Sequence, residues 1–308
     1  GMLSATTEPV SADAFIVAVP TPFTDGNKPD LKYIEAATKS LAPILKKGDL
    51  VIIESTSPVG ATEQVSQWLA GLRSDLSFPH DAGEDAEVQV SHSPERVLPG
   101  RVLIELARND RVIGGITRHC ADRTAELYRT ITDGVCHVTT ARTAELVKLM
   151  ENAYRDVNIA FANEMSLVSD RLDINVWEAI DMANHHPRVN ILKPGPGVGG
   201  HCIAVDPWFI VDGAPEDTAL IQAARGVNDS KPGHVVGQIL DAAKHHDAPT
   251  IACLGLAYKA NIDDLRESPA IEIVRLLAEA KVGDILVVEP NVKTLPEELA
   301  GGERTSLV

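Results

Sequence analysis

Short apolar runs alternate along this chain with segments of helical periodicity, and this pattern restricts it to an α/β fold. Ala14–Pro20 (AFIVAVP) and Leu50–Glu54 (LVIIE) have the length and composition of buried parallel strands. The first is followed by a turn-rich segment and a helix predicted over Leu31–Leu45. Further strands are expected at Val88–His92 and Arg111–Gly115. This repeat of strand, loop and helix predicts half of a doubly wound sheet.

A long helix is predicted after this sheet. The apolar periodicity runs from about Thr140 to Asp173, and such a run of roughly 30 residues exceeds the usual helix length in globular proteins. Helices of this length commonly connect domains or form dimer interfaces. A polar helix face is normally solvated unless neighbouring groups give it a role. One face of this helix carries Glu145, Lys148, Asn152 and Arg155.

A second strand–helix–strand unit begins near Pro232. A helix is expected over Val235–Lys244, followed by a strand that stops at Gly255. The next helix should start at Ser268-Pro269, because serine caps a first helical turn and proline is tolerated there. A strand with the sequence ILVVEP follows it. These changes of pattern divide the chain at about residues 139/140 and 231/232.

The stretch Gly195–Asp206 (GPGVGGHCIAVD) places a cysteine at the end of a glycine-rich loop. Glycines let a backbone approach a ligand closely, and their amide groups suit a phosphate, a carboxylate or an oxyanion. The stretch also satisfies the dinucleotide pattern G-x-G-x-x-G, but Pro194 and Pro196 precede it and no helical turn follows. Cys202 is therefore a candidate nucleophile, with a buried structural cysteine as the alternative.

Charge and cysteine usage exclude several classes of function. The formal net charge of −16 argues against general nucleic-acid binding, which requires clustered cations. The four cysteines form no C-x-x-C pair, so neither a metal site nor a disulfide framework is indicated. No apolar run reaches the length of a membrane span, and the N-terminus lacks the pattern of a signal peptide. We therefore expect a cytoplasmic protein.

Several stretches, taken together and in this order, resemble the UDP-glucose/GDP-mannose dehydrogenase family. They span nearly the whole chain, and the resemblance implies Rossmann-like domains at both ends. The implied division is an NAD-binding domain over 1–139, a central helical, dimerising and catalytic domain over 140–231, and a UDP-sugar-binding domain over 232–308. The matching stretches are AVPTPF, ESTSPVG, SPERVLPG, ELVKLMENAYRDVNIAFANE, GPGVGGHCIAVDPW and GLAYKANIDDLRESPA.

The resemblance implies a double oxidation, in which the C6 alcohol of a UDP-sugar becomes an aldehyde and then a carboxylate while two NAD⁺ are reduced. Cys202 would form a thiohemiacetal and then a thioester. Lys148 would transfer protons or stabilise the oxyanion, and Asn152 would donate a hydrogen bond to the same oxygen. Asp206 would orient Lys148 or the hydrolytic water. Glu95 would be the base for hydrolysis.

The substrate that the resemblance implies is UDP-N-acetyl-D-mannosamine, because HCIAVDPW and NHHPRVNILKPGPG are most similar to family members that oxidise it. UDP-GlcNAc and UDP-glucose are the alternatives. Arginines suit a diphosphate because they donate two hydrogen bonds in a fixed geometry. The implied substrate-binding residues are Arg96, Val97, Arg155, His186, Arg188, Gly199, Tyr258 and Lys259.

The implied NAD-binding residues are Thr21, Thr56, Thr62 and Arg266. The alternative interpretation of each threonine is an ordinary strand-end or capping residue. Lys259 and Arg266 could likewise be solvated surface cations. The family begins with a strand and a G-x-G-x-x-G loop, and neither is found before Ala14. We therefore expect a chain truncated at both ends, with a partial NAD domain and a UDP-sugar domain that is incomplete at its C-terminus.

Two hypotheses follow. The first is an NAD-dependent dehydrogenase that supplies a uronic acid for surface polysaccharide and forms a homodimer through the long helix. The second is a non-catalytic chain that binds a UDP-sugar or dimerises without a usable cofactor. Both predict a UDP-amino sugar as partner, and neither predicts contact with nucleic acid or membrane.

Overall fold

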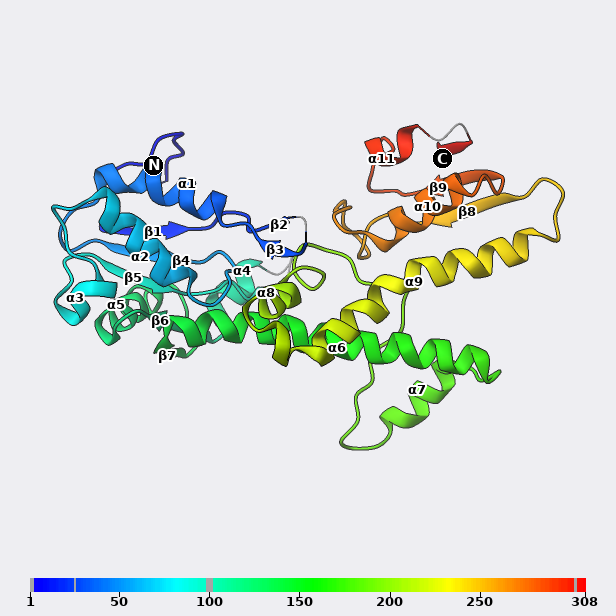
Figure 1. The fold of residues 1–308 in the computed structure, drawn as a ribbon, viewed down its shortest axis with the longest axis horizontal. Coiled ribbons are helices and arrows are strands. Elements are labelled where there is room, and N and C mark those ends of the chain that lie inside the picture. The colour runs from blue at the N-terminus through cyan, green and yellow to red at the C-terminus, as the bar shows by residue number, and fades with distance from the viewer. Residues whose placement is uncertain (1–2, 25, 98–101, 302–303) are drawn as a thin grey trace. The chain divides into compact units, whose positions relative to one another are not determined.

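The structure is a computed structural model that describes residues 3–24, 26–97, 102–301 and 304–308 (Figure 1). The last residues of the SPERVLPG stretch lie outside this part. The chain forms two compact units, each described by itself below. Unit 1 comprises Gly1–Glu151 and Trp208–Pro215, and unit 2 comprises Asn152–Pro207 and Glu216–Val308.

Unit 1 is built on a five-stranded sheet with the order β1-β4-β5-β6-β7. The pairs β1–β4, β4–β5 and β6–β7 are parallel. The four strands predicted from apolar runs are confirmed; β1 ends at Val17, three residues before the predicted Pro20, and the other three agree within one residue at each end. Their bounds are β1 Ala14–Val17, β4 Leu50–Ile53, β5 Gln89–His92, β6 Arg111–Gly115 and β7 Cys136–Thr140.

The two faces of this sheet are covered by different helices. Val51 and Ile53 belong to the core under α1 and α2, whereas Leu50 and Ile52 belong to the core under α5. Alternate residues of a strand point to opposite faces, so one apolar run fills both cores. The helices are α1 Lys32–Leu41, α2 Ala61–Leu72, α3 Pro79–Ala82, α4 Val102–Arg108 and α5 Arg118–Tyr128, with 3₁₀ turns at Ala42–Ile44 and Gly83–Asp85 and a hairpin of β2 Phe23–Thr24 and β3 Lys28–Pro29.

The pairing of β5 with β6 departs from the expected doubly wound sheet, because these two strands are antiparallel. Ser91 pairs with Gly115 and His92 with Gly114. The connection that carries α4 returns the chain to the edge at which β5 ends, so β6 starts there. As a result Arg111, the first residue of β6, lies at the carboxyl end of β5 rather than at the opposite edge.

His92 is fully buried in β5, and burial lowers the pKa of its imidazole from 6.5 to about 3. The folded protein therefore keeps this ring neutral, whereas the unfolded chain takes up a proton below about pH 6.5. Stability should fall as the pH falls through this range. When the pH is lowered from 7.5 to 5.5, the unfolding free energy of the unsubstituted protein should decrease. We expect this decrease to be about 1 kcal/mol larger than the decrease in His92→Leu.

Urea denaturation at both pH values measures this difference. His245 is exposed just after helix α9 (Ala219–Ala243), so His245→Leu should keep the pH dependence of the unsubstituted protein. An identical pH dependence in His92→Leu and the unsubstituted protein would contradict the prediction.

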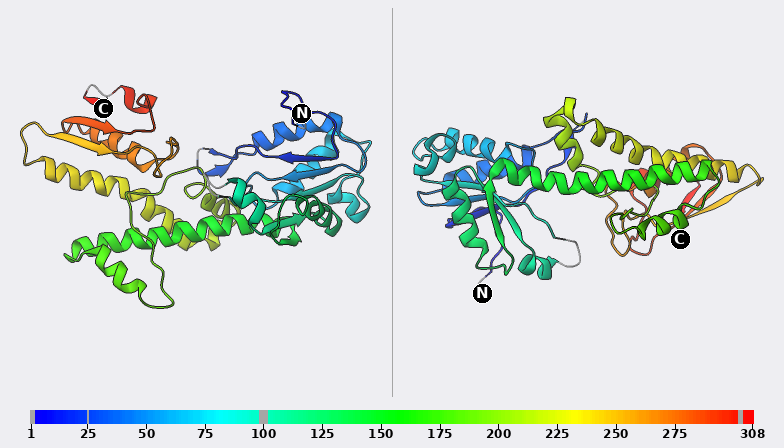
Figure 2. Two further views of the ribbon diagram at one scale, coloured as in Figure 1. Left: turned by 180° about the vertical axis from the view of Figure 1, so that it is seen from behind. Right: turned by 90° about the horizontal axis from the view of Figure 1, so that it is seen from below.

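The long helix predicted after the first sheet is confirmed as α6, Ala141–Arg171, one continuous helix in Figure 2. It is followed by α7, Val176–Asn184, whose first turn is capped by Asn175 Oδ1, which accepts hydrogen bonds from two backbone N–H groups. The segment after α7 leads into α8, Asp206–Gly213, and a 3₁₀ turn at Pro215–Asp217.

Among the residues that the structure describes, none of the helices combines the length and the apolar composition that a membrane span requires.

The predicted start of the helix at Val235–Lys244 is wrong. The observed helix, α9, runs over Ala219–Ala243 and contains Pro232. Proline lacks the N–H that would bond to the carbonyl of Asn228, and this argues for a helix end in sequence alone. Tertiary contacts outweigh that loss. Arg225, Asn228 and Lys231 are buried on α9 and bonded to α6 of the same unit.

The C-terminal sheet of unit 2 has three parallel strands in the order β10-β9-β8. The predicted start of α10 is confirmed, because Ser268 Oγ accepts a hydrogen bond from Ala270 N at 3.3 Å. A core that includes Leu256, Val274 and Val287 joins the sheet to α9, α10 and α11. The bounds are β8 Thr250–Leu254, α10 Pro269–Glu279, β9 Asp284–Val288, α11 Glu297–Ala300 and β10 Thr305–Leu307.

Candidate active site

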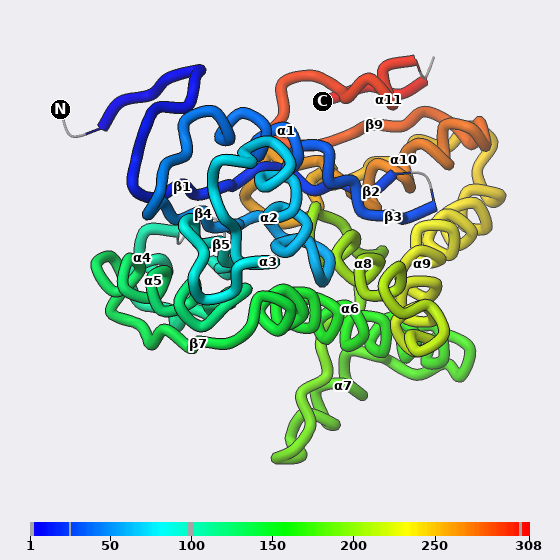
Figure 3. The backbone as a smooth tube through the Cα atoms, turned by 60° about the vertical axis from the view of Figure 1, so that its left-hand side comes forward, coloured from blue at the N-terminus to red at the C-terminus, as the bar shows by residue number. Residues whose placement is uncertain are grey.

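Cys202 lies in the segment that Figure 3 traces in yellow-green between α7 and α8. Its carbonyl oxygen accepts hydrogen bonds from Val205 N at 3.0 Å and from Asp206 N at 2.8 Å. The chain therefore turns at Cys202 directly into α8. The cysteine is half-buried, whereas Val205 and Asp206 are buried. Its backbone is thus fixed, and its side chain lies at the edge of the packed interior.

The glycines before Cys202 allow a close approach to the loop between β8 and α10. Gly200 N donates to the carbonyl of Arg266 at 3.0 Å, and Gly200 has a φ of +89°. A Cβ at this residue would come within 2.8 Å of the Tyr258 ring. A Cβ at Gly199 would lie 2.5 Å from the carbonyl oxygen of Glu267. The glycine run is therefore required by this contact with the C-terminal part of unit 2.

Gly199→Ala should displace the Cys202 loop, because the added methyl group would meet backbone that cannot yield. We expect a loss of about 1–3 kcal/mol in unfolding free energy and a larger loss of catalytic rate. Gly195→Ala is the matched control in the same loop, since its Cβ would have 4.0 Å of space. Thermal unfolding and steady-state assays of both variants measure the effects. Equal behaviour of the two variants would contradict the expected contact.

Asn152 and Asp206 are brought together within unit 2. Asn152 Nδ2 donates to Asp206 Oδ2 at 2.5 Å, and Asp206 is only 2 % exposed. Asp206 therefore holds the amide side chain that is expected to face the substrate oxygen. Lys148, four residues before Asn152 on α6, belongs to unit 1. Its action on Cys202 and its orientation by Asp206 stay predictions.

Tyr258 and Arg266 contribute to the electrostatics around Cys202. Burial raises the pKa of the Tyr258 hydroxyl, and the negative charges of Asp264 and the Cys202 thiolate act in the same direction. Arg266 donates from Nε and Nη2 to the two oxygens of Asp264 at 2.9 and 2.6 Å, and these bonds raise its pKa. A nearby cation favours the thiolate form of a cysteine. Within unit 2 Arg266, predicted as an NAD ligand, also acts electrostatically on Cys202.

Glu95 and its neighbours in unit 1 form a compact turn after β5. Glu95 Oε1 accepts hydrogen bonds from Arg96 N at 2.5 Å and Val97 N at 2.7 Å. The Arg96 guanidinium binds both oxygens of Glu151, at 3.1 and 2.5 Å. Arg96 would have to exchange this carboxylate for a substrate phosphate, so its predicted role requires a rearrangement. The sequence places Glu151 on α6 but gives no sign of this pair.

The predicted NAD-binding threonines differ in their surroundings. Thr21 and Thr56 are half-buried just beyond the carboxyl ends of β1 and β4, and Thr21 Oγ1 donates to the Thr56 carbonyl at 2.6 Å. Thr62 is fully buried, and its backbone N and its hydroxyl both donate to Glu145 Oε1. Glu145 is therefore a buried cap for the start of α2, not part of a solvated face. A contact of Thr62 with NAD stays a prediction.

The remaining predicted substrate ligands in unit 2 are largely exposed. Arg155, His186, Arg188 and Lys259 all have exposed side chains. Arg188 N donates to His186 Nδ1 at 3.3 Å, so these two lie in one turn. Their binding roles stay predictions.

A buried polar network beneath the glycine loop was missed by sequence reasoning. Gly195 N donates to Asn163 Oδ1 at 2.8 Å, and Asn163 Nδ2 donates to Asn228 Oδ1 at 2.8 Å. Asn228 in turn donates to Asp156, which also pairs with Arg225. The network ties the loop to α6 and α9. The sequence signal was weak, because these polar residues look like any others on a helix face.

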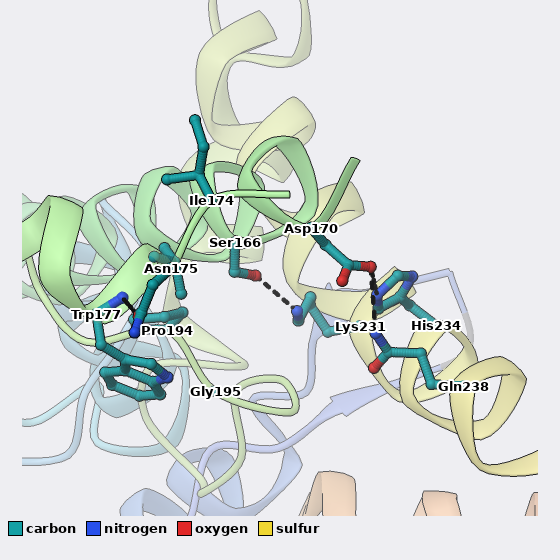
Figure 4. A pocket seen from close by; sticks show the side chains of 11 residues that line it. Ser166, Asp170, Ile174, Asn175, Trp177, Pro194, Gly195, Lys231, His234 and Gln238 are labelled. Atoms are coloured by element: carbon teal, nitrogen blue, oxygen red, sulfur yellow. Dashed lines mark hydrogen bonds and ion pairs between the residues drawn. The ribbon is translucent and has the colours of Figure 1, made fainter. Parts of the chain in front are cut away.

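A pocket in unit 2 lies apart from the predicted ligands (Figure 4). Lys231 points into it and donates to Ser166 Oγ at 2.9 Å, while Gln238 and His234 approach Asp170. None of the predicted catalytic or substrate-binding residues is among its lining residues. Among the described residues, no group of three or more His, Cys, Asp or Glu side chains could hold a metal ion.

These features define a class of protein. Unit 1 has a largely parallel sheet with polar residues at the carboxyl ends of its strands, and in unit 2 a glycine-rich cysteine loop contacts the loop between β8 and α10. Together with the long helix α6, these features are typical of nucleotide-dependent dehydrogenases. Three domain models of the UDP-glucose/GDP-mannose dehydrogenase family match most of this chain. The NAD binding domain matches residues 1–132, the central domain 142–230 and the UDP binding domain 252–307.

Relatives agree with this assignment. An "NDP-N-acetyl-D-galactosaminuronic acid dehydrogenase" of Ralstonia solanacearum is 63% identical over 98% of this chain and 72% of its own length. A "UDP-N-acetyl-D-mannosamine dehydrogenase" of Yersinia pestis is 59% identical over 98% of this chain and 74% of its own. A UDP-D-ManNAc dehydrogenase structure from Pyrococcus horikoshii is 40% identical, with a TM-score of 0.84, over 96% of this chain and 72% of that one.

This chain belongs to the UDP-glucose/GDP-mannose dehydrogenase family. It is an NAD-dependent oxidoreductase, and its predicted fold class is confirmed. The exact domain boundaries at residues 139/140 and 231/232 stay predictions.

Proposed function

We propose that this protein oxidises the C6 alcohol of UDP-N-acetyl-D-mannosamine to the carboxylate in two NAD-dependent steps, for surface polysaccharide biosynthesis. The observation that carries the proposal is Cys202, held on a glycine loop against Tyr258 and Arg266 and close in sequence to Asp206. The names of several relatives, from Yersinia pestis to Pyrococcus horikoshii, support this substrate.

In this mechanism the Cys202 thiolate adds to C6 of the aldehyde, and the carbonyl oxygen becomes an oxyanion. The Asn152 amide carries two N–H donors. One is bonded to Asp206, and the other can donate to the oxyanion. Asp206 thus aims the amide, while Lys148 would supply a positive charge or a proton. Loss of hydride from C6 then leaves a thioester on Cys202.

Hydrolysis of this thioester requires a base. Glu95 would take a proton from water as the water oxygen attacks C6, and cleavage of the C–S bond would return Cys202 as a thiolate. Thr21 and Thr56 fit a dinucleotide, because their polar groups lie just beyond parallel strands where such ligands bind. NAD⁺, when bound, accepts the hydride in each oxidation.

A substrate panel tests this proposal. UDP-ManNAc, UDP-GlcNAc, UDP-GalNAc and UDP-glucose would each be supplied with NAD⁺, and NADH would be followed by absorbance. We expect the highest kcat/KM for UDP-ManNAc and two NADH per carboxylate formed. A preference for UDP-GalNAc would favour oxidation of that epimer as the function. The name of the 63% identical Ralstonia relative suggests this second candidate. UDP binding without NADH would instead support the non-catalytic hypothesis.

We also propose that the protein is a homodimer through α6. Large apolar side chains on this helix are exposed at Met150 (55 %), Tyr154 (73 %) and Phe161 (50 %). Their spacing places them along a common side of the helix. Sedimentation analysis should show a dimer that dissociates in Tyr154→Glu/Phe161→Glu. A monomeric unsubstituted protein at micromolar concentration would contradict this assignment.

A further inference from the structure

Arg111 is a buried arginine held between two carboxylates and an aromatic ring of unit 1. Nη1 lies 3.4 Å from Glu54 Oε1, and Nη2 lies 4.0 Å from Glu95 Oε2. The guanidinium carbon lies 4.2 Å from the centre of the Tyr128 ring, and the Tyr128 hydroxyl donates to Glu54 Oε1 at 3.2 Å. Arg111 is only 6 % exposed. Its charge is therefore fixed in position by its surroundings.

The strand directions explain why these side chains meet. Glu54 follows β4 directly, and Glu95 comes three residues after β5, so both lie at the carboxyl ends of parallel strands. Because β6 is antiparallel to β5, its first residue, Arg111, reaches the same edge. In an entirely parallel sheet Arg111 would start its strand at the opposite edge.

The two oxygens of Glu95 have different surroundings. Oε1 accepts the N–H groups of Arg96 and Val97, which fixes the carboxylate to its own turn. Oε2 faces Arg111 at 4.0 Å, a separation that gives Coulomb attraction but no hydrogen bond. Arg111 therefore attracts Oε2 without donating a hydrogen bond to it.

The positive charge of Arg111 attracts both Glu54 and Glu95. Burial raises the pKa of Glu54, the negative charge of Glu95 raises it further, and Arg111 opposes both. The repulsion between Glu54 and Glu95 acts on both carboxylates. Each carboxylate therefore offsets part of the attraction between Arg111 and the other. Removal of Glu54 or of Arg111 should therefore change the electrostatic potential at Glu95 in opposite directions.

We propose that Arg111 is a positioning residue for Glu95, and that Glu54 limits how strongly the arginine stabilises the Glu95 carboxylate. This rests on the proposed function, in which Glu95 activates the water that hydrolyses the Cys202 thioester. Tyr128 holds Glu54 and the guanidinium plane in place.

The decay of acylated Cys202 tests this role directly. The enzyme is mixed with UDP-N-acetyl-D-mannosamine and NAD⁺, quenched at intervals between pH 5 and 9, and analysed by intact-protein mass spectrometry. In Arg111→Gln we expect decay about tenfold slower, with the acidic limb of its pH profile moved to higher pH. Formation of the acyl-enzyme and its NADH should remain near the unsubstituted level.

Glu54→Gln provides the opposing variant, since it leaves the positive charge to Glu95 alone. Its acidic limb should move down, whereas a merely structural defect would not give shifts of opposite sign. Arg111→Lys should restore most of the profile. Arg73→Gln is the matched control, because Arg73 binds the carbonyls of Ala42 and Leu45 elsewhere in unit 1 and should leave the profile unchanged.

Shifts of the same sign in Arg111→Gln and Glu54→Gln, or an unmoved limb in both, would overturn the proposal. If Arg111→Gln does not fold by thermal unfolding, Glu54→Gln and Arg111→Lys carry the same test. Glu95→Gln distinguishes a failure of the proposed function from a failure of the proposed role of Arg111. Rapid thioester decay in that variant would refute Glu95 as the base, and hence the proposed function's last step, rather than the arrangement around Arg111.

Discussion

Replacing Cys202 with alanine should abolish carboxylate formation, with a loss of about a thousandfold or more in rate. In the proposed mechanism this side chain is the nucleophile of the second oxidation, and the variant has no group at this position that can form a thioester. The first oxidation does not need a covalent bond, so a small amount of aldehyde should form. Hydroxylamine would trap this aldehyde, and chromatography of the UDP-sugar products would measure it against the carboxylate.

Cys136→Ala is the matched control for this experiment. Cys136 is a half-buried cysteine in β7 of unit 1, outside the proposed site. This variant should retain activity, and both variants should bind UDP with unchanged affinity by calorimetry. Carboxylate produced by Cys202→Ala at a rate within tenfold of the unsubstituted protein would refute the covalent mechanism.

Replacing Asp156 with alanine should cause the largest loss of stability, about 3–5 kcal/mol. Asp156 and Arg225 are 0 % and 2 % exposed, and Arg225 Nη1 donates to Asp156 Oδ1 at 2.7 Å. The substitution removes the buried carboxylate from Arg225, leaves it only the exposed Asp229 as a charged partner, and removes an acceptor from Asn228. Because this network supports the glycine loop, catalytic rate should fall as well. Guanidinium chloride denaturation measures the stability change.

An exposed ion pair in the same unit is the control for Asp156. Asp284 and Arg304 form a pair at 2.7 Å with side chains 51% and 54% exposed. Asp284→Ala should leave the denaturation midpoint almost unchanged, since solvent screens such a pair. The double variant Asp156→Leu/Arg225→Met should be more stable than Asp156→Ala, because it leaves no buried guanidinium that has lost its buried carboxylate. A loss as small as that of Asp284→Ala would contradict the expected cost.

Much of the fold could be predicted from periodicity. The strand at Leu50–Ile53 follows from a short apolar run, and the helix at Ala141–Arg171 follows from a helical pattern of about 30 residues. The α9 helix could not be predicted in full, because Pro232 signals a boundary that buried contacts override. Local signals fail where long-range packing supplies more free energy than the local preference costs.

The candidate site divides in the same way. Cys202, Asn152 and Asp206 could be selected from residue type and spacing, together with the family resemblance. Thr62 could not be evaluated in this way, because its hydroxyl is bonded to Glu145 more than eighty positions away. A pair so distant in sequence leaves no periodic signal.

The sequence by itself determined the alternation of strands and helices, the cysteine on its glycine loop and the family. These depend on residue type, spacing and local backbone preference, which are all written along the chain. Only the tertiary structure decided that β6 is antiparallel to β5, and therefore that Arg111 joins Glu54 and Glu95 at one edge. Strand direction is set by how connections pack in three dimensions, so charges brought together by it are invisible in a linear pattern.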